Sequence, residues 1–221
     1  MEVDRLIPIR RPPVVIPMET PWVPEGIDRE EVDACWESIV KLNPRAFDGE
    51  VLHVLGVHRN GAGGVSIHVS PCAYRYYAVQ SRGLDCGVRT LGAKAITMWQ
   101  QQMLLGLRAD WVMYYPRQWE FVPGGSVQPG QNPSETILEE LQEETFCEAG
   151  RPPLPIAVAY DPQAYSWEVV HLIDLKPDAT PIGSSEYDDL KWCKLDSLPE
   201  PLTPIAQRMT SLVGSGASGS I

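Results

Sequence analysis

The chain has 221 residues, of which 29 are Asp or Glu and 18 are Lys or Arg, so its formal net charge is −11. That length suits one enzyme domain with an extension, and 43% hydrophobic residues can build a sizeable core. The acidic balance argues against a nucleic-acid partner, which would require a basic surface. No segment approaches the roughly 18–20 apolar residues of a membrane span, so no membrane partner is expected.

The five cysteines are odd in number and scattered, without the CxxC spacing of a zinc site or the even count of a disulfide framework. The N-terminal sequence MEVDRLIPIRRPP has neither an apolar core nor a small-residue cleavage site, so we expect no signal peptide. Together these features predict a cytoplasmic protein, because thiols stay reduced in that compartment.

The first part of the chain predicts an extended arm and then a helix. Proline recurs through residues 1–25, which excludes regular helix and favours extended backbone. Residues 28–42 predict a helix, because apolar side chains recur there at helical spacing and Asn43-Pro44 follows as a stop signal.

Short runs rich in β-branched and apolar residues predict strands through the rest of the chain. These strands are residues 51–58, 65–69, 88–98, 103–107, 111–115, 119–122, 156–160 and 167–175. A Gly/Pro loop over 124–133 leads into a helix over 132–147, and a second helix is expected over 203–213. Residues 74–80 leave helix and strand open, and residues 214–221 predict a flexible tail. Interleaved strands and helices indicate a mixed α/β or α+β class.

The helix over 132–147 has strong signals at its start. Asn132 is a good N-cap, Pro133 suits the first helical position, and Glu135 completes a capping box. Ile137 and Leu141 fall on one face and should pack on the core. The sequence therefore positions this helix well.

The same helix carries the densest charge in the chain. Residues 135–148 contain six acids and no base, and Glu140, Glu143 and Glu144 share one face at i, i+3 and i+4. Like charges at that spacing cost about 0.2–0.5 kcal/mol per pair without a cation. Hard oxygen ligands in this number suit Mg²⁺ or Mn²⁺. The alternative is an ordinary solvated, Glu-rich helix.

A glycine pair directly before the helix favours a functional interpretation. Gly124 and Gly125 let backbone N–H groups approach a phosphate closely. Loop and helix together read VPGGSVQPGQNPSETILEELQEETF, which resembles the signature of the Nudix hydrolases. Anchored on Gly125, the resemblance matches the aliphatic Leu141 and the three glutamates that in the family hold the metal.

Three positions depart from the family pattern. Gln131 stands where Glu is usual, Glu139 where Arg is usual, and Phe146 where Gly is usual. In the family the first two form an ion pair, and here both partners are changed together, so no buried charge loses its partner. The departures keep a catalytically weak, nucleotide-binding module open as an alternative.

The resemblance extends beyond the signature and implies an architecture. Residues 88–213 would form a Nudix fold, an α+β arrangement described as an α/β/α sandwich with a mixed sheet. Residues 26–87 would form a small N-terminal α/β extension that contacts the substrate or a dimer partner. Motifs in that extension and just after it resemble a subgroup that hydrolyses UDP-glucose and UDP-galactose: Trp36, Asn43-Pro44, Phe47-Asp48-Gly49 and Tyr74-Arg75, followed by Leu91-Gly92.

The resemblance implies a metal-dependent pyrophosphatase. Its substrate would be a nucleoside diphosphate linked to another moiety, first of all a UDP-sugar, and its products a nucleoside monophosphate and a sugar 1-phosphate. ADP-ribose or a related diphosphate is the alternative substrate, and a homodimer is left open. No Gly-x-Ser-x-Gly motif or Cys–His pair supports nucleophilic catalysis instead.

The resemblance also implies the roles of single residues. Glu140, Glu143 and Glu144 would hold Mg²⁺ or Mn²⁺, and Glu143 is the first candidate for the general base. Glu186, on a late loop, is the alternative base. The substrate would be bound by Arg108, Gly124 and Gly125.

Overall fold

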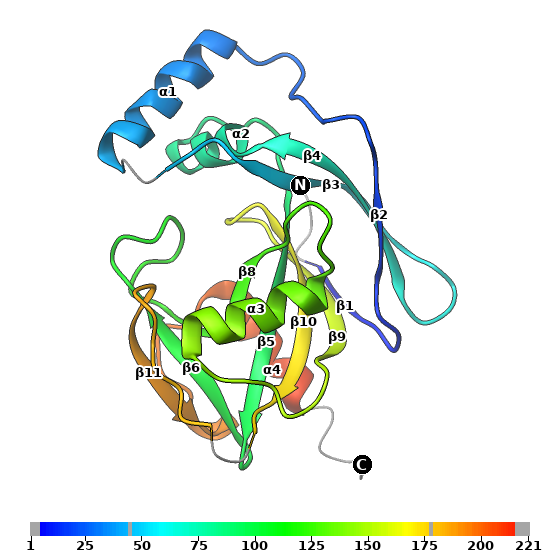
Figure 1. Cartoon of the computed structure of the whole chain (residues 1–221), viewed down its shortest axis with the longest axis vertical. Helices are drawn as coiled ribbons and strands as arrows, with labels where there is room; N and C mark the ends of the chain where they lie inside the picture. The colour runs from blue at the N-terminus through cyan, green and yellow to red at the C-terminus, as the bar shows by residue number, and fades with distance from the viewer. Residues whose placement is uncertain (1–4, 44–45, 177–178, 215–221) are drawn as a thin grey trace.

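A mixed β-sheet with helices on both faces forms the body of the protein (Figure 1). The computed structural model describes residues 5–43, 46–176 and 179–214. The strands are β1 (Leu6–Pro8), β2 (Val14–Pro17), β3 (Glu50–Arg59), β4 (Val65–Ala73), β5 (Thr90–Trp99), β6 (Gln102–Arg108), β7 (Trp119–Phe121), β8 (Gly124–Ser126), β9 (Leu154–Asp161), β10 (Ser166–Asp174) and β11 (Tyr187–Cys193). The helices are α1 (Arg29–Leu42), α2 (Tyr74–Ala78), η1 (Val79–Arg82), α3 (Pro133–Thr145), η2 (Leu195–Ser197) and α4 (Pro204–Gly214).

Strand β5 is the hub of the sheet. It pairs in parallel with β10 along its whole length, and antiparallel with β8, β6 and β3 at different points. The main path through the sheet runs β1-β9-β10-β5-β3-β4-β2. Outside this path, β6 pairs with β7 on one side and β11 on the other. Residues on β5 therefore lie next to segments that are far away in the sequence.

Alternation along β5 separates the two layers of the core. Leu91, Ala93 and Ala95 belong to one apolar cluster with Ile137 and Leu141 of α3. On the opposite face of the strand, Ile96 belongs to a second apolar cluster with Ile205 and Met209 of α4. Helices α3 and α4 thus cover opposite faces of the sheet, and the predicted α+β architecture with its mixed sheet is confirmed. Among the described residues, no helix is long and apolar enough to cross a membrane.

An N-terminal extension lies over one end of this body (Figure 1). It consists of α1 packed against α2, η1 and the β3–β4 hairpin. The predicted helix over 28–42 is confirmed: Asp28 caps it, and Val32 and Trp36 are buried on its inner face. The extension joins the body where β3 meets β5, at the pair His53–Thr90. A further link runs from the Tyr77 hydroxyl to the Ala164 carbonyl at 3.0 Å.

The proline-rich arm is extended, as predicted, and it is also part of the sheet. Strand β1 pairs antiparallel with β9 at the edge of the body, and β2 pairs in parallel with β4 at the edge of the extension. In Figure 1 the arm runs along the side of the molecule between these two edges. The arm therefore ties body and extension together.

Two local predictions change, and one open alternative is resolved. Residues 111–115, predicted as strand, form turns and bends, because Tyr115 and Arg117 adopt positive φ around Pro116. The loop predicted over 124–133 begins with β8, which pairs with β5. Residues 74–80, left open between helix and strand, are helical. Of the predicted tail, residues 215–221 lie outside the described residues.

Candidate active site

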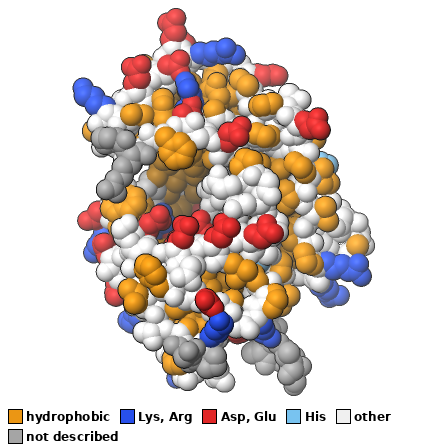
Figure 2. Space-filling model, viewed as in Figure 1, with side chains coloured by type: hydrophobic (Ala, Val, Ile, Leu, Met, Phe, Trp, Pro, Cys, Tyr) orange, Lys and Arg blue, Asp and Glu red, His pale blue; other side chains and the backbone are white. Residues whose placement is uncertain are grey.

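A cleft with a volume of about 440 Å³ opens where the extension meets the body. Figure 2 shows a hollow on this face, with a row of acidic side chains at its lower edge along the course of α3. One end of the cleft is charged, and its lining includes Lys94, Arg108, Glu120, Glu140 and Glu186. The other end is rich in tyrosine and includes Tyr74, Tyr77, Tyr114, Tyr115 and Glu168.

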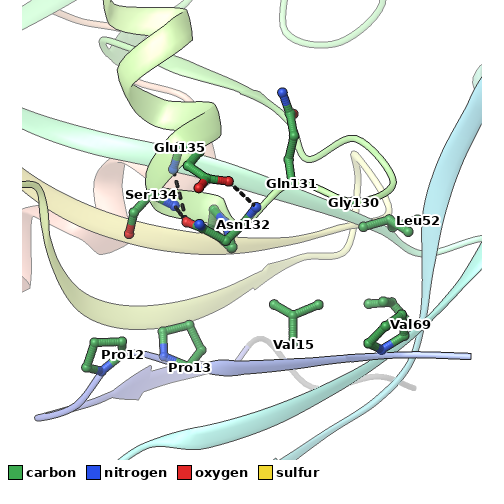
Figure 3. Close-up of a pocket in the computed structure, with 12 residues that line it drawn as sticks. Pro12, Pro13, Val15, Leu52, Val69, Gly130, Gln131, Asn132, Ser134 and Glu135 are labelled. Atoms are coloured by element: carbon green, nitrogen blue, oxygen red, sulfur yellow. Dashed lines mark hydrogen bonds between the residues drawn. The ribbon is translucent and has the colours of Figure 1, made fainter.

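The start of α3 is fixed by the predicted capping box (Figure 3). The Asn132 side chain accepts hydrogen bonds from the N–H groups of Ser134 and Glu135 at 2.9 and 3.0 Å, and Glu135 accepts one from the Asn132 N–H at 3.2 Å. The Ser134 hydroxyl also lies 3.1 Å from Nε2 of the buried His171 on β10. These contacts anchor the helix to the sheet and set the direction in which its glutamates point.

A second cavity, of about 490 Å³, lies between this helix start and the arm (Figure 3). Pro12, Pro13 and Val15 form its arm side. On the helix side, Asn132 and Ser134 are already engaged in the cap and in the contact with His171. The charged cleft is therefore the better candidate for a catalytic site.

Glu144 and Glu140 of α3 meet the loop before the helix. Glu144 is buried, and its carboxylate accepts hydrogen bonds from the Gly124 N–H at 3.2 Å and the Tyr187 hydroxyl at 3.3 Å. Glu140 lies against Gly125, where an added Cβ would be 2.7 Å from the Glu140 Cγ and closer still to its carboxyl. A side chain at position 125 would therefore displace the Glu140 carboxyl.

The carboxylates of α3 influence one another. Burial, followed by the neighbouring Glu143 and Glu186, raises the pKa of Glu140 to about 7. Burial also raises the pKa of Glu144 well above its usual value, with Glu120 and Glu140 adding to the effect. Clustered carboxylates with raised pKa values form a site that a cation would stabilise.

Of the three glutamates only Glu140 lines the cleft; Glu144 is buried behind it, and Glu143 is exposed. Glu186, the alternative base, also lines the cleft. Within the described residues, no three Cys, His, Asp or Glu side chains are close enough together to form a finished metal cage. The fit to Mg²⁺ or Mn²⁺ rests on the donors themselves, which are the carboxylate oxygens of Glu140 in the cleft and of its neighbours Glu143 and Glu144.

Next to Glu144 lies a buried charge cluster that the sequence did not reveal: the Tyr187 hydroxyl is 3.3 Å from Glu144 and 3.1 Å from Glu120. Glu120 on β7 is 2% exposed and forms ion pairs with Lys94, at 2.7 Å, and with Arg108. Burial alone would raise the pKa of Glu120, but the two cations outweigh it and hold that pKa at about 2. Lys94 and Arg108 thus place two cations in this part of the cleft, and cations there suit a phosphate.

The predicted substrate ligand Arg108 belongs to this cluster. Its Nε donates to the Tyr114 carbonyl at 3.0 Å, so both the carboxylate and the 109–118 loop hold the guanidinium in place at the cleft. Lys94 was missed, although one signal was available: it is the only charged residue in the apolar strand TLGAKAITMW. An isolated charge in such a strand needs a buried partner.

The structure shows what the three residues that depart from the family signature do in this chain. The Gln131 side-chain amide donates to the Glu139 carboxylate at 2.7 Å, so a hydrogen bond still joins the loop to the helix where the family has an ion pair. Phe146 ends α3 in the left-handed conformation, with φ at 58°. The loop and the helix end are therefore both preserved, the latter with a residue that favours this conformation poorly.

Comparison with known proteins agrees with this fold. The NUDIX domain model matches residues 88–213, more than half of the chain. A bifunctional NMN adenylyltransferase/ADP ribose pyrophosphatase from Francisella tularensis has a TM-score of 0.50 at 16% identity, covering 64% of this chain and 46% of that one. A MutT NUDIX hydrolase from Burkholderia pseudomallei has a TM-score of 0.49 at 22% identity, covering 56% and 96%. No curated protein matches significantly.

Proposed function

The chain belongs to the Nudix family, and on that premise we propose that it hydrolyses a nucleoside diphosphate linked to a sugar, first of all a UDP-sugar. The expectation of a hydrolase acting on pyrophosphate bonds is confirmed at the level of the family. The products would be a nucleoside monophosphate and a sugar 1-phosphate. The observation that carries the proposal is the cleft, in which the cations Lys94 and Arg108 lie close to the glutamates of α3.

We assign the diphosphate to the space between these two groups. Lys94 and Arg108 would neutralise part of its charge, and the glycine pair 124–125 would let the backbone approach it. Glu140, Glu143 and Glu144 would hold Mg²⁺ or Mn²⁺, and the ion would neutralise the diphosphate and orient the attacking water. The buried Tyr187 hydroxyl lies between the Glu120 and Glu144 carboxylates and would position the two relative to each other.

Two carboxylates compete for the role of general base. Glu143 was the first candidate from the sequence, but Glu186 is the one that lines the cleft. A base must reach the water whose proton it accepts. We therefore assign the base to Glu186 and leave Glu143 as a metal ligand.

The experiment is hydrolysis of a panel of UDP-sugars, ADP-ribose and dinucleoside diphosphates with Mg²⁺, followed by chromatography of the products. The proposal requires phosphate-containing products from a UDP-sugar, with kcat lowered about 100- to 10,000-fold in Glu186→Gln. Glu143→Gln should instead raise the Mg²⁺ concentration needed for half-maximal rate. Preference for ADP-ribose would select the alternative substrate, and nucleotide binding without turnover would reveal a weak binding module.

A further inference from the structure

Glu168 is a buried carboxyl that the proposed hydrolysis does not use. It lies on β10, is 8% exposed, and contributes to the tyrosine-rich end of the cleft. Directly across the sheet from it is Gly92, where an added Cβ would be 2.8 Å from the Glu168 Cδ. The carboxyl therefore lies over the space that the missing side chain leaves.

Within the protein, only one of the two oxygens of this carboxyl accepts a hydrogen bond. The Ser166 hydroxyl donates to Oε1, and among the described residues no donor is within hydrogen-bond distance of Oε2. Oε2 is not among the fully enclosed polar atoms that lack a partner, so it is open to the cleft. An oxygen in this position can accept a hydrogen bond from a ligand in the cleft.

Position along the cleft narrows the kind of ligand. Lys94 is two residues from Gly92 on β5, so it lies next to Glu168 and forms part of the proposed phosphate site. In a nucleoside diphosphate sugar, the group bonded directly to each phosphate is a sugar ring, and the base is one ring further away. A side chain beside the phosphate site would therefore meet ring hydroxyls.

Tyrosines from the extension form the wall next to this carboxyl. The rings of Tyr74 and Tyr77 on α2 are 6.0 Å apart, and the Tyr77 ring is 5.9 Å from that of Tyr114. The Tyr77 hydroxyl is already bonded to Ala164, so the ring itself is what Tyr77 offers to a ligand. Aromatic rings beside a hydrogen-bonding carboxyl suit a ring that has both C–H and O–H groups.

We propose that Glu168, together with Tyr74 and Tyr77, forms a subsite for the sugar ring attached to the diphosphate, with the Glu168 carboxyl bonded to a ring hydroxyl. This inference rests on the proposed function for the identity of the ligand. It makes the N-terminal extension part of the substrate site.

The test measures binding of the two product classes by calorimetry, because products bind without turnover. The nucleotide arm compares UMP with its 2′-deoxy and 2′,3′-dideoxy forms. The sugar arm compares glucose 1-phosphate with its 2-deoxy and 3-deoxy forms. Each ligand is titrated with Mg²⁺ into wild type, Glu168→Leu, Glu168→Gln and the control Glu37→Leu, which makes the same change at an exposed position of α1.

In wild type and in the control, loss of the contacted hydroxyl should weaken binding about 10- to 100-fold. In Glu168→Leu the same loss should change the Kd less than about twofold, because the partner is already gone. Glu168→Gln should give an intermediate value. Equal binding of the deoxy ligands to wild type and Glu168→Leu will show that the variant is folded.

Two results would overturn the subsite. One is an equal loss on hydroxyl removal in wild type and Glu168→Leu. The other is a wild-type protein that binds none of these monophosphates, or binds them all alike. Neither depends on hydrolysis, so failure of the proposed reaction would be recognised separately, as absence of products from the diphosphate panel.

Discussion

Phe146 has a backbone conformation that a phenylalanine favours poorly. It ends α3 in the left-handed region, and its side chain is 61% exposed, so it gains little from burial. We predict that Phe146→Gly raises the free energy of unfolding by about 1 kcal/mol, since glycine adopts this conformation without strain. Urea denaturation followed by circular dichroism measures the change. An unchanged or lower stability would mean that the Phe146 ring contributes packing that outweighs the strain.

Gly125 gives a second prediction at the same scale. In Gly125→Ala the new methyl group would displace the Glu140 side chain, because it overlaps the space of that carboxyl. A displacement of about 1 Å at a reacting site lowers kcat/KM about 100-fold. The control is Gly183→Ala, where the nearest atom, Cγ of Leu190, is 3.4 Å from the new methyl. Steady-state kinetics that show the same rate for both variants would contradict the placement of Glu140.

At the scale of residues, the sequence predicts relations between groups that are neighbours in the chain. The spacing of Glu140 and Glu144 on one helix, next to the glycine pair, is such a relation, and the structure places Glu140 in the cleft. Lys94, Glu120 and Glu168 come from three different strands, and only the register of the sheet brings them to one cleft. No local spacing encodes that register.

At the scale of elements, the Lys94–Glu120–Arg108 cluster joins β5, β6 and β7. The folded-state pKa of Glu120 is about 2, below its ordinary value of 4.5, so folding favours the carboxylate. The ionised Glu120 therefore contributes to the free energy of unfolding. This contribution is fully present above pH 4.5 and is lost as the pH falls toward 2. A shift of this size corresponds to about 3 kcal/mol. We predict that wild type loses this amount over that pH range.

The measurement is chemical denaturation of wild type and Glu120→Gln between pH 2 and pH 7. Near neutral pH the variant should be less stable by about 3–5 kcal/mol, because Lys94 and Arg108 lose their buried partner. The difference should shrink as the pH falls below 4.5. A difference that does not vary with pH would show that the ion pairs do not set the pKa of Glu120.

Element prediction was accurate where periodicity and end signals agreed. The helix over 132–147 had a cap, a proline and an apolar face, and the structure gives Pro133–Thr145. The segment 111–115 failed because its aromatic residues have high strand propensity, while Tyr115 and Arg117 on either side of Pro116 take turn conformations. There the tertiary contact of Arg108 with Tyr114 decides the conformation.

At the scale of the whole molecule, the N-terminal arm covers two edges of the sheet. Strands β1 and β2 cover the edges of β9 and β4, and Ile9 between them is buried. Deletion of residues 1–17 should lower the stability by about 2–4 kcal/mol, or roughly 5–15 °C in Tm. It should also promote self-association, because uncovered strand edges pair with other chains. Calorimetry and light scattering measure both effects, and deletion of residues 1–4 is the control. An unchanged Tm would refute the structural role of the arm.

At this scale the sequence predicted an extended arm, an α/β extension and a mixed-sheet body. It did not predict which strands the arm would join, because nothing in the sequence around residues such as Leu6 and Val14 indicates the strand with which each will pair. Those pairings follow from the shape of the finished sheet.

The hydrogen bond between Gln131 and Glu139 has an evolutionary consequence. If the ancestor had the family's Glu and Arg at these positions, two single substitutions separate it from this chain. Changing Arg to Glu first would have placed two carboxylates against each other, whereas changing Glu to Gln first would have left an amide oxygen to accept from the Arg. The order in which the glutamine came first is therefore the one that selection would tolerate at every step, and reconstructed ancestors of this lineage should contain Gln with Arg.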